Sequence, residues 1–257
     1  MKGIVNIGNS CYLNAVIQLL FNSPDFCKMV EKSGNELIIN NIKNYFTNNN
    51  LSFNPMEIKA LLDQRTILFK GNDQCDSSEV IIFLFDILNI NNKKNYFTID
   101  TTINIKCKLN DCLHQNEHVE KDLILFLPIT TDLDSSYREY KMYEKLESSY
   151  RCDNCNNNTI SRKKIVTSNW PNNLIIVLKR FDINMRKNNN MVEVPLLWRH
   201  DYKLVGGIIH GGNMNGGHYI YYGYENNNWY IANDSNIIKV NNITQYVNNS
   251  YILYYRK

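Results

Sequence analysis

The stretch GIVNIGNSCYLN, residues 3–14, places a loop rich in Gly and Asn directly before a cysteine. Apolar residues then recur at helical spacing, so we expect a helix over residues 11–22 that begins at Cys11. The dipole and the unpaired N–H groups at a helix N-terminus stabilise a thiolate and lower its pKa. Asn6 adds a side-chain amide that can donate to a developing oxyanion. The pattern indicates a nucleophile, although a buried structural cysteine at a helix start would explain Cys11 at least as well on its own.

A thiolate needs a base, and the sequence contains five histidines. His218 follows a loop-like run of Gly and Asn and precedes a strand-like run. Asn233 and Asp234 come shortly after it, and a hairpin with a turn at residues 226–228 would bring one of them beside the imidazole. An oxygen that accepts from one ring nitrogen fixes the tautomer and leaves the other nitrogen facing the cysteine. The other histidines have poorer contexts and are interpreted as surface or hydrogen-bonded residues: His114, His118, His200 and His210.

The rest of the first third of the chain is predicted to be helical. One pattern covers about 36–47, and two more helices begin at Asn54 and Asp76, each with Glu three residues after the capping side chain. Alternating apolar runs then predict strands, with one more helix expected over 137–147. Helices followed by strands predict an α+β protein, and without a repeat or a linker we expect a single domain, residues 1–257. The predicted strands lie around Ile103–Ile105 and Leu123–Leu127 and over Leu174–Phe181, Lys203–His210, Tyr219–Tyr224, Trp229–Ile231, Ile237–Val240 and Tyr251–Tyr255.

Composition and charge exclude several classes of protein. The 257 residues carry 28 Lys plus Arg against 25 Asp plus Glu, and a net charge of +3 is too weak to indicate a nucleic-acid or anionic-membrane partner. No apolar run reaches the roughly 18 residues of a transmembrane helix, and Asn6, Asn9 and Asn14 interrupt any signal-peptide core. We therefore expect a cytoplasmic or nuclear protein whose seven cysteines are reduced thiols, metal ligands or a nucleophile. The Asn runs are interpreted as loops, and the composition would suit a large DNA virus or an AT-rich protist; for a viral protein the host cell or the virion is the expected location.

Five blocks of the sequence together resemble the ubiquitin-specific proteases, a family of papain-like deubiquitinating cysteine proteases. GIVNIGNSCYLN resembles the cysteine box of that family, and IIHGGNMNGGHYIYYGYENNNWYIANDSNIIKV, residues 208–240, resembles its histidine box. QCDSSE, residues 74–79, is similar to the family's Gln/Asp box. NLIIVLKRF, residues 173–181, is similar to its long central strand, and SYILYYR, residues 250–256, to its last strand.

The resemblance covers residues 3–256 and implies a papain-like cysteine protease fold. That fold has a helical thumb, at about 3–95 here, and a β-rich palm with zinc-tipped β fingers over about 96–257, the fingers lying at about 100–180. The resemblance further implies that the partners are ubiquitin and ubiquitinated proteins, that the enzyme is a monomer, and that catalysis needs no cofactor.

By the same resemblance, Cys11 attacks the carbonyl after the last glycine of ubiquitin. His218 takes the thiol proton and later returns it to the leaving amine. Asn233 matches the third catalytic position, Asp234 a position that assists, and Asn6 the residue that stabilises the oxyanion. The matching residues expected to bind the substrate are Gln74, Asp76, Glu79, Gly217 and Tyr219.

Four positions depart from the family pattern. Ser10 and Leu13 replace the commoner Thr and Met, Cys75 replaces a second Gln, and Ala232 replaces Phe. None of these changes removes a catalytic group. An amide at Asn233 cannot balance an imidazolium as a carboxylate can, so turnover is expected to depend on the following aspartate or to be modest.

Four further cysteines suggest a metal site. Cys152 and Cys155 form a CxxC pair, which is half of a typical zinc site, and Cys107 and Cys112 supply a pair with a longer spacer. The family places a structural four-cysteine zinc at the tip of its fingers, and these positions match. His114 is the substitute ligand if Cys112 points away. Free thiols are the alternative, and the remaining cysteines, Cys27 and Cys75, are interpreted as ordinary thiols.

Two other functions stay open at this point. A catalytically weak or inactive ubiquitin-binding module would share the fold, although it would be expected to lack one of the four residues Asn6, Cys11, His218 and Asn233. A protease for another ubiquitin-like modifier would share the chemistry, because the boxes mainly recognise an extended Gly-Gly tail.

Overall fold

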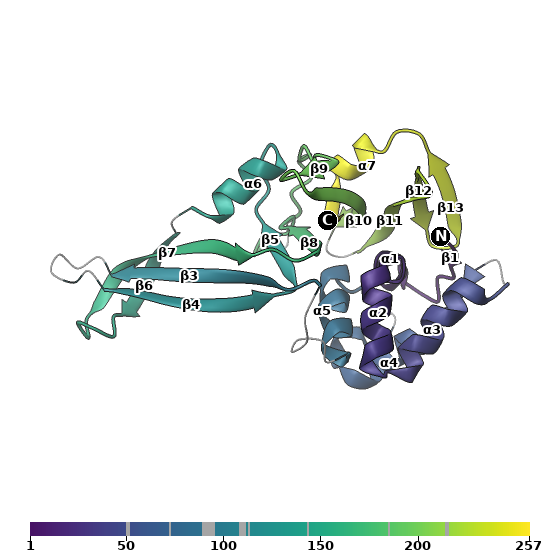
Figure 1. Ribbon diagram of the computed structural model, residues 1–257, viewed down its shortest axis with the longest axis horizontal. Helices are drawn as coiled ribbons and strands as arrows, with labels where there is room; N and C mark the ends of the chain where they lie inside the picture. Colours follow the sequence, from purple (N-terminus) through teal and green to yellow (C-terminus); the bar gives the residue numbers. More distant parts are fainter. Residues whose placement is uncertain are drawn as a thin grey trace.

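The computed structural model describes residues 1–49, 52–71, 73–88, 96–107, 112, 114–142, 144–184, 186–213 and 216–257. Figure 1 shows three parts: a group of helices, a mixed sheet beside them, and a second sheet that extends away as a long arm. None of the described helices is long and apolar enough to cross a membrane.

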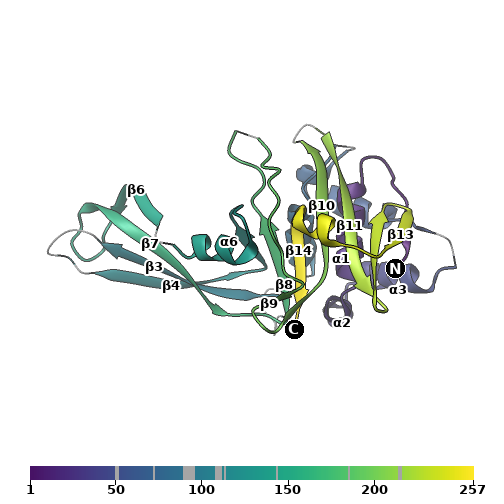
Figure 2. The same ribbon diagram turned by 90° about the horizontal axis from the view of Figure 1, so that it is seen from above.

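The helical part is built around one helix that is buried on every side. All residues of this helix, α1 (Cys11–Phe21), are buried, because the other helices cover one side and the mixed sheet covers the other (Figure 2). The sequence analysis missed α2, although Ser23 caps it, Pro24 opens it and Gly34 ends it with a φ of 71°. The other elements of this part are α2 (Pro24–Ser33), α3 (Glu36–Thr47), α4 (Met56–Arg65), a 3-10 turn (Ile67–Phe69), α5 (Ser77–Ile87) and the parallel pair β1 (Gly3–Ile4) and β2 (Ser52–Phe53).

The mixed sheet, called the palm sheet below, separates two hydrophobic cores. Successive side chains of its buried strand β8 point to opposite faces of the sheet and so enter different cores. Ile175 and Val177 pack with the helices, whereas Leu174, Ile176 and Leu178 pack on the opposite face. The strands follow the order β13-β12-β11-β10-β14-β8-β5, with β5 parallel to β8. Their bounds are β5 (Ile124–Leu127), β8 (Asn173–Leu178), β9 (Leu197–Trp198, paired with β10), β10 (Tyr202–Asn213), β11 (Gly216–Glu225), β12 (Asn228–Asn233), β13 (Asn236–Val240) and β14 (Ser250–Arg256), and α6 (Leu133–Tyr140) and α7 (Thr244–Asn248) lie on the second face.

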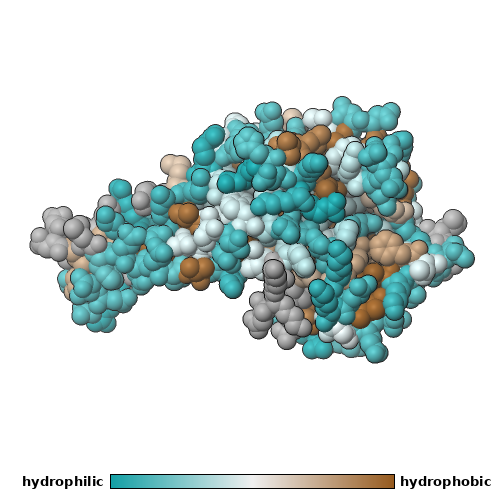
Figure 3. Space-filling model, in the orientation of Figure 1, coloured by the Kyte–Doolittle hydropathy of each residue, from teal (hydrophilic) through white to brown (hydrophobic). Residues whose placement is uncertain are grey.

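The arm, called the finger sheet below, is an antiparallel sheet of four strands in the order β4-β3-β7-β6. Figure 3 shows that the face of the arm seen in that view is mostly hydrophilic. The helix expected over 137–147 is wrong: α6 begins at Leu133, ends at Tyr140 and is followed by strand β6, which pairs with β7. The strands are β3 (Ile99–Cys107), β4 (Gln115–Asp122), β6 (Glu144–Arg151) and β7 (Asn158–Asn169).

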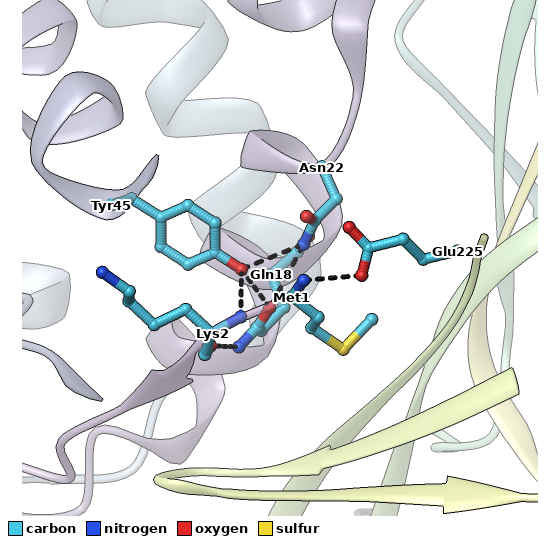
Figure 4. Close-up of polar contacts among 6 residues, drawn as sticks. All are labelled: Met1, Lys2, Gln18, Asn22, Tyr45 and Glu225. Carbon is cyan, nitrogen blue, oxygen red and sulfur yellow. Dashed lines mark hydrogen bonds and ion pairs between the residues drawn. The ribbon is translucent and has the colours of Figure 1, made fainter. Parts of the chain in front are cut away.

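The segment that leads to Cys11 is held by polar contacts from three elements (Figure 4). The Met1 amine lies 2.5 Å from Glu225 Oε2 on β11. The Lys2 N–H donates to Tyr45 Oη on α3 at 3.2 Å, and Gln18 of α1 donates to the Lys2 carbonyl at 2.5 Å. The start of the chain is therefore fixed between the helices and the palm sheet.

Candidate active site and four-cysteine cluster

Cys11 opens helix α1 after a tight loop. Gly8 and Asn9 have positive φ angles of 105° and 47°, which Gly and Asn tolerate better than most residues. The Asn6 side chain organises this loop, because its Oδ1 accepts from Gly8 N at 3.1 Å and from Ser10 N at 3.3 Å. The helix therefore begins at Cys11, as the sequence predicts, and the Cys11 side chain is only 1% exposed.

The environment of Cys11 keeps its thiol protonated. Burial raises the pKa of the Cys11 thiol above its ordinary value, and the nearby Asp234 carboxylate raises it further. A hydrogen bond from the Tyr219 backbone and the N–H groups at the start of α1 act in the opposite direction but do not outweigh burial. The expectation that the helix N-terminus alone would lower this pKa is therefore wrong for the buried sulfur, and a base is needed to remove the proton.

His218 and Asn233 form a hydrogen-bonded pair across a hairpin. Strands β11 and β12 are antiparallel, and the turn between them uses Asn226 and Asn227 at φ angles of 48° and 61°. The predicted contact is present, with His218 Nε2 and Asn233 Oδ1 2.6 Å apart. Because an amide oxygen accepts from Nε2–H, Nδ1 is the ring nitrogen left for a second partner.

Cys11 and the histidine loop are joined through neighbours. Over the described ranges of the chain, no hydrogen bond links Cys11 Sγ to the His218 ring. Gln74 connects them: its Nε2 donates to Cys11 Sγ at 3.8 Å and to the Gly217 carbonyl, and its Oε1 accepts from Gly217 N at 2.6 Å. A side chain at Gly217 would collide with the buried His210 ring, so glycine is required at this position. Gln74 therefore holds the backbone just before His218 close to Cys11.

Asp234 contacts asparagines rather than the His218 ring. Its Oδ2 accepts from Asn6 Nδ2 at 2.8 Å and its Oδ1 from Asn14 Nδ2 at 2.7 Å. The Ile4 N–H donates to the Asp234 carbonyl at 2.9 Å, which fixes the residue at a φ of 50°. The carboxylate thus fixes the Asn6 side chain. It accepts from one N–H of the Asn6 amide, and the second N–H of that amide is left for another acceptor.

The sequence analysis missed two residues of this region. Asn14 is 3% exposed and lies one helical turn after Cys11, so a polar residue in an otherwise apolar helix was the available signal. His210 is 6% exposed and its ring centroid lies 4.5 Å from that of Tyr219, directly after His218. Its position in an apolar strand gives no sign of this contact.

The two acidic residues expected to bind the substrate differ in how far their carboxylates are already hydrogen-bonded within the fold. Asp76 caps α5 through Ser78 N at 2.6 Å, and its other oxygen accepts from Tyr251 Oη at 2.6 Å. Glu79 as a whole residue is exposed, although partial burial of its carboxyl group, together with the charge of Asp76, raises its pKa. Asp76 is therefore largely committed to the fold, whereas Glu79 is available to a ligand.

Two hollows lie between α5 and the palm, on the side of Gln74 and Asp76. The larger, of about 400 Å³, lies between α5 and the palm and has Glu79, Ile82 and Phe126 on its walls. The smaller, of about 90 Å³, has Gln74 and Tyr219 on its walls. Asp76 and Phe181 line both hollows. Together they form a groove between the helices and the palm. The groove ends at Gln74, whose side chain is hydrogen-bonded to Cys11.

At the far end of the finger sheet, four cysteines converge. The sulfurs of Cys107, Cys112, Cys152 and Cys155 all lie within 4.8 Å of one another. Those of Cys112 and Cys152 are 3.7 Å apart, close to the roughly 3.8 Å expected for two thiolates bound tetrahedrally to one zinc ion at about 2.3 Å. Four thiols with this spacing fit a structural zinc ion. His114 takes part through its carbonyl, which accepts from Cys107 N at 3.0 Å, rather than as a ligand in this group.

Neighbouring polar groups also hold the four cysteines in place. Asn154 Nδ2 lies 3.6 Å from Cys112 Sγ, and this contact lowers the pKa of the Cys112 thiol. The backbone between the second pair turns back on itself, because Asn156 N donates to the Cys152 carbonyl at 2.8 Å. The contact with Asn154 therefore favours the thiolate form of Cys112, the form that metal ions bind.

Comparisons with known proteins agree with this fold. The family model described as ubiquitin carboxyl-terminal hydrolase matches residues 2–255. Ubiquitin carboxyl-terminal hydrolase 16 of Arabidopsis thaliana is 27% identical over 99% of this chain, and ubiquitin carboxyl-terminal hydrolase 4 of Vanderwaltozyma polyspora is 24% identical over 99%. The matched regions make up 30% and 41% of those proteins, so the chain spans well under half the length of these curated relatives.

Solved structures show the same architecture. Ubp8 in the SAGA DUB module bound to ubiquitin aldehyde superimposes with a TM-score of 0.79 at 19% identity, covering 100% of this chain and 69% of Ubp8. A Ubp8 variant in the module bound to monoubiquitin gives a TM-score of 0.80 at 19% identity, with the same coverage. The α+β fold with a helical thumb, a β-rich palm and cysteine-tipped β fingers is thereby established. With a family model matched along nearly its whole length, the chain belongs to the ubiquitin carboxyl-terminal hydrolase family.

Proposed function

We propose that the protein is a deubiquitinating cysteine protease that cleaves the peptide or isopeptide bond after the C-terminal glycine of ubiquitin. The observation that carries this proposal is the meeting of three features at one point. These are a buried cysteine at a helix start, a His218–Asn233 pair on the adjacent hairpin, and a groove that ends at Gln74, which hydrogen-bonds to both Cys11 and the residue before His218. Family membership and the ubiquitin-bound state of the structural relatives support the same substrate.

In this proposal His218 Nδ1 removes the proton of the Cys11 thiol, and Asn233 holds the imidazole by its Nε2. The sulfur then attacks the carbonyl carbon of the terminal glycine, and the carbonyl oxygen takes up the negative charge. The second N–H of the Asn6 amide and the N–H groups at the start of α1 stabilise this oxyanion. Its collapse expels the amine, which receives the proton from His218, and water then hydrolyses the thioester.

Substrate recognition is proposed to follow the groove. An extended glycine-rich tail fits a narrow passage that larger side chains would block, and Glu79 offers a carboxylate to basic residues of that tail. A further hollow of about 440 Å³ lies at the base of the finger sheet, with Tyr140, Met142 and Ile165 on its walls. Lys179 lines this hollow and the groove, which supports one continuous binding face for the tail and the folded body of ubiquitin.

We further propose that residues 1–257 act as one catalytic domain, with the thumb over about 3–95 and the palm and fingers over about 96–257. A zinc ion held by Cys107, Cys112, Cys152 and Cys155 would brace the finger tip and supply no chemistry to the reaction. We also propose that the enzyme acts on ubiquitinated proteins as a monomer.

The test is hydrolysis of ubiquitin carrying a fluorogenic amine at its C-terminus, followed by cleavage of diubiquitins of each linkage. The expected result is turnover by the wild-type protein and none by Cys11→Ala. Cys27→Ala, which removes a thiol on α2, is the matched control and should retain activity. Failure of the folded wild-type protein to cleave any of these substrates, or cleavage by Cys11→Ala, would refute the proposal. Parallel probes built on other ubiquitin-like modifiers identify which modifier the groove accepts.

A further inference from the structure

A cavity of about 430 Å³ lies on the palm beside the groove that leads to Cys11; Arg180 also lines the larger hollow of that groove, and His210 lines the smaller one. It is enclosed by the end of strand β10, by helix α7 and by the segment that follows β8. Its volume is within the range of about 300–1,000 Å³ that is typical of small-ligand pockets. Its lining contains two cations, one imidazole, several amide side chains and no carboxylate, namely Arg180, Lys187, His210, Asn189, Gln245 and Asn249 among the wall residues.

Arg180 is a buried cation without an acidic partner. The residue is 3% exposed, and four of its five N–H groups donate to backbone carbonyls. Nε donates to Ser250 at 2.7 Å, and Nη2 donates to Asn248 at 3.4 Å. The two N–H groups of Nη1 donate to Asn188 and Asn190 at 3.1 and 2.9 Å. Within the described residues, no Asp or Glu oxygen lies within 4.0 Å of the guanidinium. One N–H of Nη2 therefore remains for another acceptor.

Lys187 and His210, which also line the cavity, have hydrogen-bonding groups left over as well. Lys187 Nζ donates to the His210 carbonyl at 2.5 Å and to the Gly212 carbonyl at 3.2 Å, which uses two of its three N–H groups. His210 Nδ1 is buried and has no hydrogen-bond partner among the described residues, while the Nε2 side of the ring packs against Gly217. Among the described residues, Arg180 and Lys187 thus each retain one N–H group without an acceptor, and His210 retains one ring nitrogen without a partner.

The electrostatics of this wall are unfavourable as they stand. Burial lowers the pKa of Arg180, and burial together with the charge of Arg180 lowers that of Lys187. Burial and then Lys187 lower the pKa of His210 to about 4, although the Asp76 carboxylate acts in the opposite direction. Arg180 is buried and Lys187 is half-buried, and a cation withdrawn from water without an ion-pair partner costs free energy. An anion placed between the two would offset that cost while accepting their remaining N–H groups.

We propose that this cavity is a binding site for a small phosphate-type oxyanion, held by the remaining N–H groups of Arg180 and Lys187, with the His210 ring on the same wall. Free phosphate and a phosphate monoester share the chemistry that these donors recognise, and the cavity has room for either. The site adjoins the histidine hairpin, because Gly211 on its wall pairs with His218. The proposal does not depend on the hydrolase activity, since binding is measured directly.

The test is titration calorimetry of the full chain with inorganic phosphate at neutral pH and at constant ionic strength set by sodium chloride. We expect saturable binding at one site. Lys187→Met and Gln245→Glu should each weaken it by at least about tenfold, the first by removing a donor and the second by adding a negative charge to the wall. Gln245 is exposed, so this variant tests the site even if Lys187→Met fails to fold.

Arg186→Met is the matched control. Arg186 neighbours Lys187 in the chain, but its side chain is exposed, pairs with Asp182 at 2.9 Å and lies outside the cavity lining, so its removal should leave the affinity unchanged. Absence of saturable phosphate binding, equal weakening by Arg186→Met, or equally tight binding of acetate would overturn the proposal. Tighter binding of O-phosphoserine than of phosphate would identify a monoester as the ligand, and weaker binding would identify free phosphate.

Discussion

The candidate active site and the tip of the finger sheet are built in opposite ways. At the active site, packing fixes the backbone: α1 is buried along its whole length, and the strand after His218 lies against it. At the tip, β4 is exposed along most of its length, and the buried residues that cluster there are three of the four cysteines, with Cys155 packed against them. Precision at one end therefore comes from a large core, whereas order at the other depends on four sulfurs.

This difference separates two kinds of sensitivity. Changes in the hydrogen bonds around Cys11 should reduce the rate of the chemical step while the protein stays folded. Changes at the four cysteines should loosen the arm and weaken substrate binding while the chemical step survives. The four predictions below test this separation, beginning with the largest expected effect.

Replacement of His218 should cause the largest loss of activity among the changes considered at the candidate active site. His218→Ala removes the base for a thiol that burial keeps protonated, so kcat should fall by about 10³ or more, the range of general acid–base catalysis. Steady-state kinetics with the fluorogenic ubiquitin substrate measure this. His200→Ala, at an exposed histidine, is the control and should match the wild type. A loss of less than about tenfold would mean that another group removes the proton.

The pH dependence of Cys11 alkylation should show the raised thiol pKa. A raised pKa means that the proton is held more tightly, so the reactive thiolate is scarce at pH 7 and grows as pH increases. The iodoacetamide rate at Cys11 should therefore rise by about tenfold per pH unit, or about 10² between pH 7 and pH 9. Peptide mass spectrometry after timed quenching gives the rate. A plateau already reached below pH 7 would contradict the expected sign, because it would indicate a preformed thiolate–imidazolium pair.

Asp234→Asn should separate alignment of Asn6 from proton transfer. The amide has one oxygen where the carboxylate has two, so either Asn6 or Asn14 loses its acceptor, and Asn tolerates the positive φ of this position. We expect kcat to fall by about thirtyfold, within the effect of a weakened oxyanion donor. KM should change little. Asp201→Asn, at an exposed aspartate, is the control, and unaltered kcat in Asp234→Asn would contradict the alignment role.

Cys155→Ser should affect the tip without affecting the chemistry. Loss of one of four metal ligands should raise KM for ubiquitin substrates by about tenfold and leave kcat within about twofold, because the site lies at the far end of the arm. Elemental analysis should give one zinc per wild-type chain and less in the variant. Cys27→Ser is the control. A comparable fall in kcat, or a metal-free wild type with normal KM, would erase the distinction between the two regions.

The sequence was most informative where local chemistry and burial agree. The helix at Cys11, the cap at Asp76 and the hairpin at residues 226–228 were all predictable, because caps, apolar spacing and turn residues are local signals. The His218–Asn233 contact followed from that hairpin once the family resemblance gave the order of the boxes.

What the sequence could not show depends on tertiary contacts. Strand β6 has the Glu, Lys and Ser content of a surface helix, and only its pairing with β7 makes it a strand, which is why the helix expected over 137–147 was wrong. The partners of Asp234 come from residues more than 200 positions away, so no spacing rule predicted that it would bind Asn6 and Asn14 instead of His218. The raised pKa of Cys11 likewise comes from burial by the whole fold.

The central claim is that Cys11 is the nucleophile toward the C-terminal glycine of ubiquitin. It is tested most directly by incubating the protein with ubiquitin that carries an electrophile in place of its terminal carboxylate, followed by peptide mapping of the adduct. The account expects one covalent ubiquitin per chain, attached at Cys11, and none on Cys11→Ala. Attachment at another cysteine, or no adduct with folded wild-type protein, would contradict it.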